Sequence, residues 1–529
     1  MSRARCAADL PPSRLLLGAV LTVLPTAWLL SCGGQNGTAD IAQQIDAGCV
    51  APGQICGESC LPPCPADMSR DADCQCWDAA VPLPVGATRV DATLCLSGFM
   101  PGGTSEPAKV RRAWFFSALK SMGIGKLRGH FLWHVVEPSK GKFDWNSTDQ
   151  LVAECQAHGV ELVGLLAYGN PWASKEGKAH NDHHYPPDNP ADFGDYAAAV
   201  VARYKDKVRL WEVWNEQNSG FRFWKGTGSL GGDPKAYGAL LRAAYLSIKA
   251  VDPSAVVGYG GLFYLPQLIP GAIDFTAASF AAWPDLSDHF DAYAWHPYSP
   301  YPPIASPEDA GDPRSNALKP VPADETARRV TKLLQEHKAG PTRLWVTELG
   351  WPTEKAVTEK QAAAYLVRSY VLLLSESVEL LCWYTLMDGH PDHVPLAFWE
   401  KVFGMYHWAD TGAGEVPDAK PSVLAHQRLF ERLGAMRYAA NRSASPAPGR
   451  PPRHHVFAAA DGRLAHVLWD PAQSVDETSP YAFPARAKTN YLAVTFLGAP
   501  LEATVDGQHL LHVAVGGSPV YVVEAPISR

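Results

Sequence analysis

The sequence carries no excess of positive charge: 46 Lys and Arg residues stand against 54 Asp and Glu residues, for a formal net charge of −8 at pH 7. Neutralising nucleic-acid phosphates takes clustered basic side chains, so this balance argues against a nucleic-acid partner. The sequence also contains no internal repeat and no low-complexity tract. With 47% hydrophobic and 10% aromatic residues over 529 positions, it has the composition of a globular protein of two or three domains.

The apolar run near the N-terminus is too short for a membrane-spanning helix. It covers residues 15–30, about 16 positions, and Pro25 interrupts it. Basic residues precede it and Cys32 follows it, which is the pattern of a secretory signal. The segment resembles a bacterial lipoprotein signal, which implies removal of residues 1–31 and lipidation of Cys32; a plain signal peptide with an incidental Cys stays open. We expect the protein to be exported, either secreted or lipid-anchored to the bacterial cell envelope (outer membrane or cell surface).

Cysteine placement agrees with export. Six of the 11 Cys residues crowd into 28 positions within residues 32–85, which we interpret as a tether followed by a small disulfide module with 15 possible pairings. A zinc site is the alternative, although no His accompanies the cluster. Cys95, Cys155 and Cys382 are scattered along the rest of the chain.

From residue 86 onward, short β-branched runs alternate with amphipathic stretches, as in parallel βα units. Eight strands are predicted, at residues 88–96, 125–131, 161–167, 208–214, 255–260, 290–295, 343–347 and 378–385. Their helices are predicted at residues 106–122, 147–158, 190–204, 234–251, 275–282, 324–337, 359–374 and 422–433. Eight such units predict an α/β fold, a closed (β/α)₈ barrel over residues 86–440. A Pro-rich linker at 443–452 and short alternating segments predict a small β-sandwich within residues 441–529.

Two carboxylates lie where barrel strands end, the edge that carries chemistry in this fold. The fourth strand ends in Trp-Asn-Glu at Glu216, and the seventh ends in Thr-Glu-Leu-Gly-Trp around Glu348. Cleaving a glycosidic bond takes such a pair, one acid to protonate the leaving oxygen and one carboxylate to attack or stabilise the anomeric carbon. Asn215 beside the first carboxylate is suited to holding a ring hydroxyl.

These motifs resemble the clan A glycoside hydrolases, whose two glutamates follow strands four and seven. The stretch Trp-Asn-Glu-Gln-Asn at 214–218, with Phe223-Trp224 and Asp252-Pro253 further along, is similar to glycoside hydrolase family 39. That family includes β-xylosidases, α-L-iduronidase and bacterial exopolysaccharide hydrolases. The likeness covers residues 86–436.

The resemblance implies that Glu216 is the acid/base, Glu348 the nucleophile and Asn215 the ligand of the sugar 2-hydroxyl. His296 and Tyr298, after the sixth strand, match a site His and a Tyr that hydrogen-bonds the nucleophile.

Two further substrate-binding residues follow from the same resemblance, and others from their aromatic rings. Arg128 matches an Arg that pairs with the nucleophile region, and Trp383 matches the sugar platform under the reaction centre. Trp172 is one of several aromatic residues that line further subsites or pack in the core; the others are Trp133, Phe221, Phe223, Trp224, Trp351 and Trp399.

Other polar residues have structural interpretations. Glu212 is expected to alternate inward with Trp214 and to be a buried partner of Arg128. Residues 180–184 (His-Asn-Asp-His-His) have a metal-like composition, but consecutive loop residues seldom converge on one ion, so a loop or cleft rim is favoured. His130 and His134 are likewise not assigned a metal.

The sequence therefore predicts a retaining glycoside hydrolase that cleaves a poly- or oligosaccharide by double displacement, with no cofactor. The alternative is a non-catalytic surface glycan-binding lipoprotein on a glycosidase-like barrel. Loss of a catalytic carboxylate usually marks such a protein, and both glutamates are present here. The expected partners are a carbohydrate substrate and, through the lipid anchor only, a membrane.

Overall fold

The computed structural model describes residues 87–264, 271–298, 304–309, 319–337, 340–354, 356–392, 398–443 and 452–525, with residue 81 and four short strands before them. The predicted signal segment at 1–31, the lipidation site Cys32 and the tether lie outside the described residues. Among the described residues, none of the helices has both the length and the apolar character that crossing a bilayer requires.

The Cys-rich segment contributes two antiparallel hairpins. One pairs β1 (Gln54–Cys56) with β2 (Ser59–Leu61), and the other pairs β3 (Met68–Arg70) with β4 (Cys76–Asp78). The chain divides into two compact units between Pro65 and Ala66, so the first hairpin belongs to one unit and the second to the other. The pairing of the six clustered Cys residues lies outside what the structure describes.

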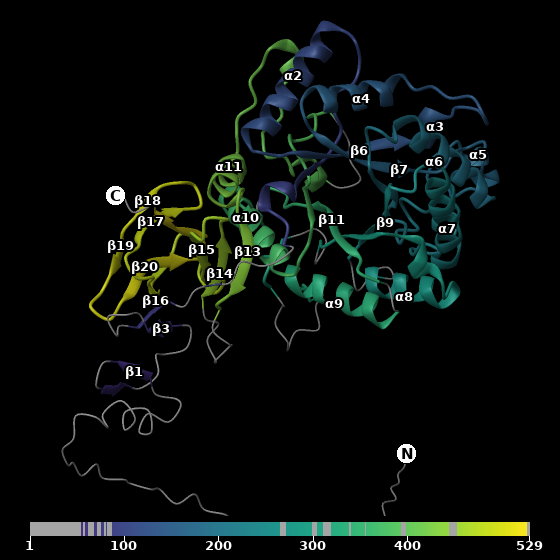
Figure 1. The fold of residues 1–529 in the computed structure, drawn as a ribbon. Coiled ribbons are helices and arrows are strands. Elements are labelled where there is room, and N and C mark those ends of the chain that lie inside the picture. Colours follow the sequence, from purple (N-terminus) through teal and green to yellow (C-terminus); the bar gives the residue numbers. More distant parts are fainter. Residues whose placement is uncertain are drawn as a thin grey trace, which may run out of the picture. The chain divides into compact units, whose positions relative to one another are not determined.

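Eight parallel strands close into a barrel in chain order, which confirms the predicted fold class (Figure 1). They are β5 (Leu94–Ser97), β6 (Lys126–Leu132), β7 (Glu161–Ala167), β8 (Leu210–Asn215), β9 (Val256–Phe263), β10 (Ala292–His296), β11 (Arg343–Leu349) and β12 (Leu380–Trp383). Each lies on a predicted strand, and the largest difference is at the first, where a 3₁₀ turn (Val90–Ala92) takes the place of the expected extended start.

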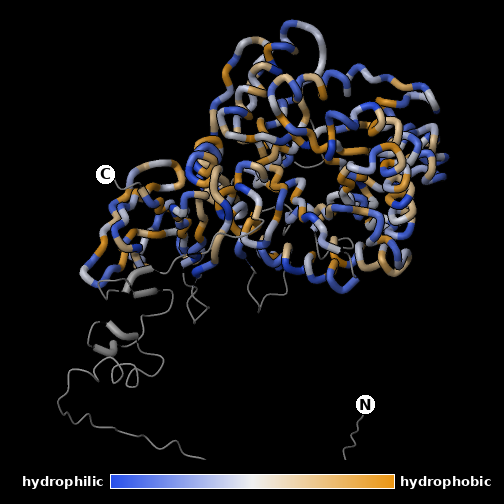
Figure 2. The backbone as a smooth tube through the Cα atoms, in the orientation of Figure 1, coloured by the Kyte–Doolittle hydropathy of each residue, from blue (hydrophilic) through white to orange (hydrophobic). Residues whose placement is uncertain are grey.

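The predicted helices form around this barrel. They are α2 (Glu106–Ser121), α4 (Asn146–Ala157), α6 (Pro190–Tyr204), α7 (Pro234–Val251), α8 (Ala272–Ala282), α9 (Ala323–Glu336), α10 (Glu359–Ser375) and α11 (Pro421–Leu433). Their starts carry local signals: Asp233 caps α7 ahead of a Pro, and Thr358 forms a capping box with Gln361 on α10. Figure 2 shows hydrophobic and hydrophilic stretches alternating along the outer helices, as expected for helices that cover a barrel on one face. Two short helices, α3 (Trp133–Val136) and α5 (Lys175–His180), were not predicted.

A disulfide joins the first and last strands where the barrel closes. Cys95 and Cys382 are direct partners in the pairing of β5 with β12, and their sulfur atoms are bonded across 287 residues of sequence. Both side chains are buried in the barrel interior beside Val163, Leu210 and Trp345. The remaining scattered residue, Cys155, is a buried free thiol.

Two antiparallel sheets follow the barrel, as predicted. One has the order β13-β14-β15-β21-β17-β18 and the other β16-β20-β19. Their strands are β13 (Arg437–Asn441), β14 (Arg453–Ala458), β15 (Leu464–Trp469), β16 (Thr478–Pro484), β17 (Asn490–Thr495), β18 (Pro500–Leu501), β19 (Ala503–Val505), β20 (Leu510–Gly516) and β21 (Val520–Ala525). Because β13 precedes the Pro-rich segment, the first sheet takes in residues ahead of the predicted boundary at 441.

A buried ion pair links this region to a loop at the barrel mouth. Glu308, in the loop after β10, accepts from Arg368 Nε of α10 at 2.9 Å and from Trp469 Nε1 of β15 at 2.9 Å. Both members of the ion pair are almost fully buried. The sheets therefore help to hold Glu308, ten residues after Tyr298, in place.

Candidate active site

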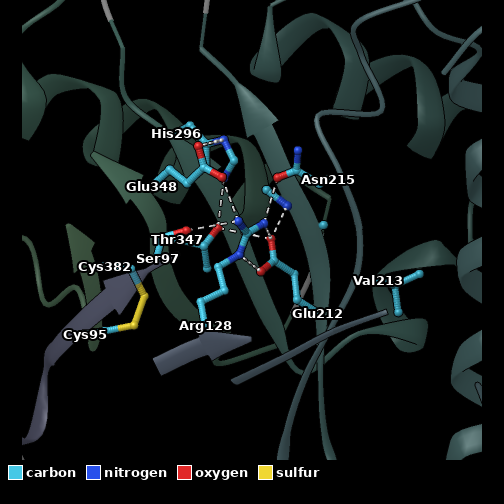
Figure 3. A network of polar contacts seen from close by, with 12 residues as sticks. Cys95, Ser97, Arg128, Glu212, Val213, Asn215, His296, Thr347, Glu348 and Cys382 are labelled. Carbon is cyan, nitrogen blue, oxygen red and sulfur yellow. Dashed lines mark hydrogen bonds and ion pairs between the residues drawn. A yellow bond between two sulfur atoms is a disulfide. The ribbon is translucent and has the colours of Figure 1, made fainter. Parts of the chain in front are cut away.

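Arg128 of β6 is the centre of a buried polar network at the carboxyl end of the barrel (Figure 3). Its guanidinium makes a two-point ion pair with Glu212 of β8, at 2.6 and 3.0 Å. It also donates to Glu348 Oε1 of β11 at 2.7 Å and to Asn215 Oδ1 at 2.7 Å. Arg128 and Glu212 are fully buried and paired, which confirms the predicted pairing of these two residues. One cation thus positions groups from two other strands, β8 and β11.

The end of β8 departs from regular strand geometry. Trp214 has a φ of 70° and Glu216 a φ of 49°, a left-handed conformation that is costly for a bulky residue. The expectation that Trp214 points inward with Glu212 is wrong: its ring packs on Trp224 and Phe193, outside the barrel. The left-handed turn breaks the alternation, and in this way consecutive residues, Asn215 and Glu216, both reach the mouth.

A chain of hydrogen bonds runs from Glu212 to Glu216. Glu212 Oε1 accepts from Thr347 Oγ1 at 3.1 Å, Thr347 Oγ1 lies 3.0 Å from His296 Nε2, and His296 Nδ1 lies 2.9 Å from Glu216 Oε1. The Thr347 hydroxyl donates its single hydrogen to Glu212, so it can only accept in its contact with His296. His296 Nε2 must therefore carry a proton and donate it to Thr347 Oγ1. In a neutral His296, Nδ1 then carries no proton and can only accept a hydrogen bond. Its hydrogen bond with Glu216 therefore requires a protonated Glu216 carboxyl group as the donor.

The electrostatics of the cluster agree with this assignment. Burial raises the pKa of Glu216 to about 7, against a lowering by Arg222 and Arg128, and burial lowers the pKa of His296 to about 4. Burial also raises the pKa of Glu348, but the contact with Arg128 opposes that shift. Below pH 7 the arrangement therefore favours a protonated Glu216, while Glu348 beside it is paired with the Arg128 cation, so two environments separate the two carboxyl groups.

The two carboxylates face each other closely. His296 Nδ1 lies 3.9 Å from Glu348 Oε2 as well as 2.9 Å from Glu216 Oε1. One oxygen of each glutamate and this nitrogen all lie within 4.8 Å of one another. Carboxyl groups about 5 Å apart are typical of retaining glycosidases, whereas inverting enzymes keep them about 6.5–9.5 Å apart to admit a water. Arg128 occupies Oε1 of Glu348, so Oε2 is the oxygen available for attack.

A cavity of about 270 Å³, here called the catalytic cavity, opens above this cluster. Asn215 lines it with its carbonyl on Arg128 and its amide donating to Tyr168 Oη at 3.1 Å, which leaves one amide hydrogen for a ligand. Its wall is formed by Ser97, Gly98, Phe99, His130, Tyr168, Asn215, Glu216, Arg222, Phe223, Phe263, Tyr298, Glu348, Tyr384, Glu400 and Phe403. The predicted site residues Glu216, Glu348, Asn215 and Tyr298 are thus brought together on one wall, with His296 and Arg128 directly behind it.

Trp383 and Trp172 do not line this cavity. Trp383 is 1% exposed and packs on Trp351 and on Tyr370 of α10, in the layer between strands and helices. Strand alternation explains this placement, because the preceding residue, Cys382, faces the barrel interior. Tyr384, one residue further on, lines the cavity where Trp383 was expected.

Trp172, for which a subsite and core packing were both open, packs against other residues and does not line the catalytic cavity. Its indole donates to the backbone carbonyl of Glu137 at 3.0 Å and packs edge-on against the buried Trp133. Trp224 and Trp351 are buried as well, whereas Phe223 lines the cavity and Phe221 is exposed. The side chain of Trp399 lies outside the described residues.

Several residues at the site were not singled out from the sequence. Gly261 of β9 is one: a Cβ there would lie 2.6 Å from Thr347 Oγ1 and 2.8 Å from Glu212 Oε1, and would also clash with His296. Its backbone N–H donates to Glu212 at 2.7 Å. Only glycine leaves room for the chain of hydrogen bonds, and Gly-Gly at the end of a predicted strand was a signal that could have marked such a close approach.

An ion pair spans the cavity rim. Arg222, after β8, donates to Glu400, after β12, at 2.7 Å, and the Arg222 guanidinium lies 4.7 Å from the centre of the Phe223 ring. This pair was also missed, because its members are 178 residues apart in loops without a recognisable pattern. Glu400 therefore neutralises the charge of Arg222 at the rim.

The metal-like segment converges more than its sequence suggested. Ligand atoms of Asp182, His183 and His184 lie within 4.8 Å of one another, so the expectation that consecutive loop residues stay apart is wrong here. However, Asp182 is already engaged by His184 Nδ1 at 2.8 Å and by Lys225 Nζ at 2.6 Å, and that ammonium disfavours a second cation. We therefore assign no metal to this cluster.

Comparison with known proteins supports the fold. The model of Glycosyl hydrolase family 10 matches residues 129–254, and no curated protein matches the chain. A solved family 39 glycoside hydrolase from Bacteroides cellulosilyticus WH2 is 20% identical, with a TM-score of 0.62 over 85% of this chain and 84% of that one. A family 39 β-xylosidase from Caulobacter crescentus is 18% identical, with a TM-score of 0.56 over 84% and 98%. These likenesses show that the chain shares the barrel fold of these enzymes.

Proposed function

We propose that the chain is a retaining O-glycosyl hydrolase that acts on a poly- or oligosaccharide. The observation that carries the proposal is the pair Glu216 and Glu348, whose carboxylate oxygens lie within 4.8 Å of each other. Burial raises the pKa of Glu216 to about 7, and Glu348 is paired with Arg128. The barrel shared with solved family 39 structures is consistent with this activity.

In the first step, Glu348 Oε2 attacks the anomeric carbon while the bond to the leaving oxygen breaks, and that oxygen takes the proton of Glu216. The product is a glycosyl ester on Glu348. In the second step, Glu216, now ionised, takes a proton from water, and the water oxygen displaces Glu348 from the anomeric carbon. Arg128 and Asn215 orient the nucleophile and the sugar 2-hydroxyl, and no cofactor enters either step.

Proton NMR of the earliest products tests this scheme directly. The anomeric proton of the released sugar is expected to show the configuration of the substrate. Release of the opposite anomer would contradict double displacement, whatever the rate.

Substitution of the nucleophile tests the residue assignment. Glu348→Ala is expected to lower turnover of an aryl glycoside by several orders of magnitude, and added azide is expected to restore part of it by replacing the missing carboxylate. Glu379→Ala, which removes a half-exposed carboxylate from the opposite end of the barrel, is the matched control. Wild-type turnover in the Glu348 variant would refute the assignment.

The rival function is glycan binding without turnover on the same barrel. Catalysis is favoured because both carboxylates are present, together with Arg128, which pairs with Glu348, and the His296–Thr347 hydrogen bonds that favour a protonated Glu216. A panel of aryl glycosides and polysaccharides, with wild type beside Glu348→Gln, separates the two: binding by both proteins with hydrolysis by neither would establish the rival.

We further propose that the protein is exported and anchored to the cell envelope through lipid on Cys32. The support is the basic, apolar and Leu-Leu-Ser-Cys order of the N-terminal residues. Mass spectrometry of the mature N-terminus, with Cys32→Ser for comparison, tests it; a mature chain that starts elsewhere and carries no lipid would contradict the anchor.

A further inference from the structure

A second cavity adjoins the catalytic cavity on the side of the first two strands. It measures about 590 Å³, more than twice the catalytic cavity, and lies between the loop after β5 and the segment from β6 to α4. Its volume falls in the range of about 300–1,000 Å³ that is typical of ligand sites. The two cavities share Gly98, Phe99 and His130, so their common wall belongs to both. We call this second space the glycone cavity, for the reason given next.

The proposed chemistry fixes which part of a substrate faces this cavity. The leaving group must lie next to Glu216, which follows the fourth strand and is accompanied there by Arg222 and Phe223. In a ring of eight strands, the first strand lies across the mouth from the fourth and fifth. The far end of the sugar being cleaved therefore points toward Phe99 and His130. Any further unit attached at that end enters the space beyond them.

Phe99 has the properties of a sugar-binding platform. It is 71% exposed, one of the most exposed large hydrophobic side chains in the described part of the chain. Its ring is stacked on His130, with centroids 4.0 Å apart and planes 10° apart, which fixes its orientation while one face stays open. Burial lowers the pKa of His130 to about 3, so this supporting ring is uncharged at neutral pH.

The remaining wall suits an uncharged sugar. Leu132, Val135 and Leu151 give apolar faces, while Asn146 and Ser147 at the start of α4 give an amide and a hydroxyl. None of the described residues on this wall has a charged side chain. A third cavity, of about 430 Å³, also touches Phe99 but contains Arg111 and Asp410, paired at 2.9 Å. The uncharged lining and larger volume favour the glycone cavity for a neutral ring.

We propose that the glycone cavity binds a second, uncharged sugar unit linked to the non-reducing side of the cleaved residue, with Phe99 as its stacking platform. This inference rests on the proposed hydrolase function and adds a substrate class to it: glycosides whose glycone has at least two sugar units. The enzyme then releases oligosaccharides from a chain and does not require a terminal single sugar.

Substrate length provides the test. The probes are 4-nitrophenyl β-xyloside and β-xylobioside, and 4-nitrophenyl β-glucoside and β-cellobioside. In the series that the enzyme accepts, kcat/KM is expected to be at least about 10-fold higher for the disaccharide than for the monosaccharide, the scale of one added stacking contact. The released sugar, followed by mass spectrometry, is expected to be the intact disaccharide.

Variants localise the effect. Phe99→Ala is expected to bring the disaccharide-to-monosaccharide ratio of kcat/KM close to one, and Gly102→Trp, which fills only the glycone cavity, to do the same. Phe143→Ala is the matched control, because Phe143 is also an exposed ring stacked on another ring, that of Trp145, but lines none of the three cavities. It is expected to keep the wild-type ratio.

The outcomes separate this inference from the function on which it rests. Hydrolysis with retention but with equal kcat/KM for both lengths would overturn the glycone subsite and leave the hydrolase intact. A disaccharide-to-monosaccharide ratio of kcat/KM close to one in Ala409→Trp, which fills the third cavity, but not in Gly102→Trp, would place the second sugar in the third cavity. That result would overturn the assignment. Titration of Glu216→Gln with xylose, xylobiose, glucose and cellobiose measures binding without turnover, and equal affinity within both pairs would also overturn it.

Discussion

Glu216 is expected to reduce the stability of the protein at alkaline pH, and Glu216→Gln tests this. The carboxyl is 6% exposed, and its pKa rises from 4.5 to about 7 on folding. The folded chain thus holds a proton that the unfolded chain releases at lower pH. The stability that this proton provides is complete below pH 4.5 and is lost as the pH rises through 7. Above pH 7 the wild type contains a buried carboxylate that faces the bare nitrogen of His296.

The size of the effect follows from the shift. A difference of about 2.5 pKa units corresponds to about 3 kcal/mol at full titration. Between pH 5 and pH 8, the wild type loses about 2–3 kcal/mol of this contribution to its free energy of unfolding. Gln cannot ionise, and its amide donates to His296 Nδ1 as the carboxylic acid does. We compare the free energy of unfolding of Glu216→Gln minus that of the wild type at the two pH values. This difference is therefore expected to be about 2–3 kcal/mol larger at pH 8 than at pH 5.

Urea unfolding followed by Trp fluorescence at the two pH values measures this difference. Glu106→Gln, on the exposed start of α2, is the control and is expected to show no such dependence. The kcat/KM profile of the wild type is expected to fall above pH 7, where Glu216 loses the proton it must donate, and to fall at low pH, where Glu348 becomes protonated. An equal stability difference at pH 5 and pH 8 would refute the protonated Glu216 and the hydrogen-bond chain that requires it.

Three further substitutions probe the supports of the site. Thr347→Val removes the hydroxyl that fixes the His296 tautomer, so the alkaline limb of the kcat/KM profile is expected to shift while the far-ultraviolet circular dichroism stays unchanged; an unmoved limb would contradict the chain. Replacing both Cys95 and Cys382 by Ser opens a 287-residue loop and is expected to lower the free energy of unfolding by about 4–5 kcal/mol, measured by urea titration. Glu308→Ala leaves the buried Arg368 guanidinium without its carboxylate partner and is expected to cost about 3–5 kcal/mol in the same titration.

The barrel was predictable because its signals are local. A side-chain cap and an N-terminal Pro mark the starts of α6 and α7, and both helices begin and end where the sequence predicted them. Glu216 and Glu348 were recognisable for a related reason: in this fold the ends of strands converge on one rim, so a residue's position along its own strand suffices to place it.

What the sequence did not reveal depends on contacts between distant segments or on side-chain direction. The disulfide of Cys95 with Cys382 requires the exact pairing of the first and last strands, which no local pattern encodes. The prediction for Trp383 was wrong because neighbouring residues of a strand point to opposite faces. An error of one residue therefore exchanges the barrel interior for the layer between strands and helices. Phe99 was not predicted as a site residue, because the sequence alone does not show whether an aromatic residue in a loop is exposed or packed in the core.

The charge of the buried cluster explains how one arrangement can serve both proposed steps. Before attack, Glu212 and Glu348 are ionised, Glu216 is protonated, and one guanidinium, that of Arg128, pairs with both carboxylates. Esterification removes the charge of Glu348 at the moment when Glu216 gives up its proton, so the net charge of the cluster stays at one negative unit. The ester no longer repels a carboxylate at Glu216, and Arg128 still attracts it. The pKa of Glu216 therefore falls in the intermediate, which makes the residue that began as the acid the base for water.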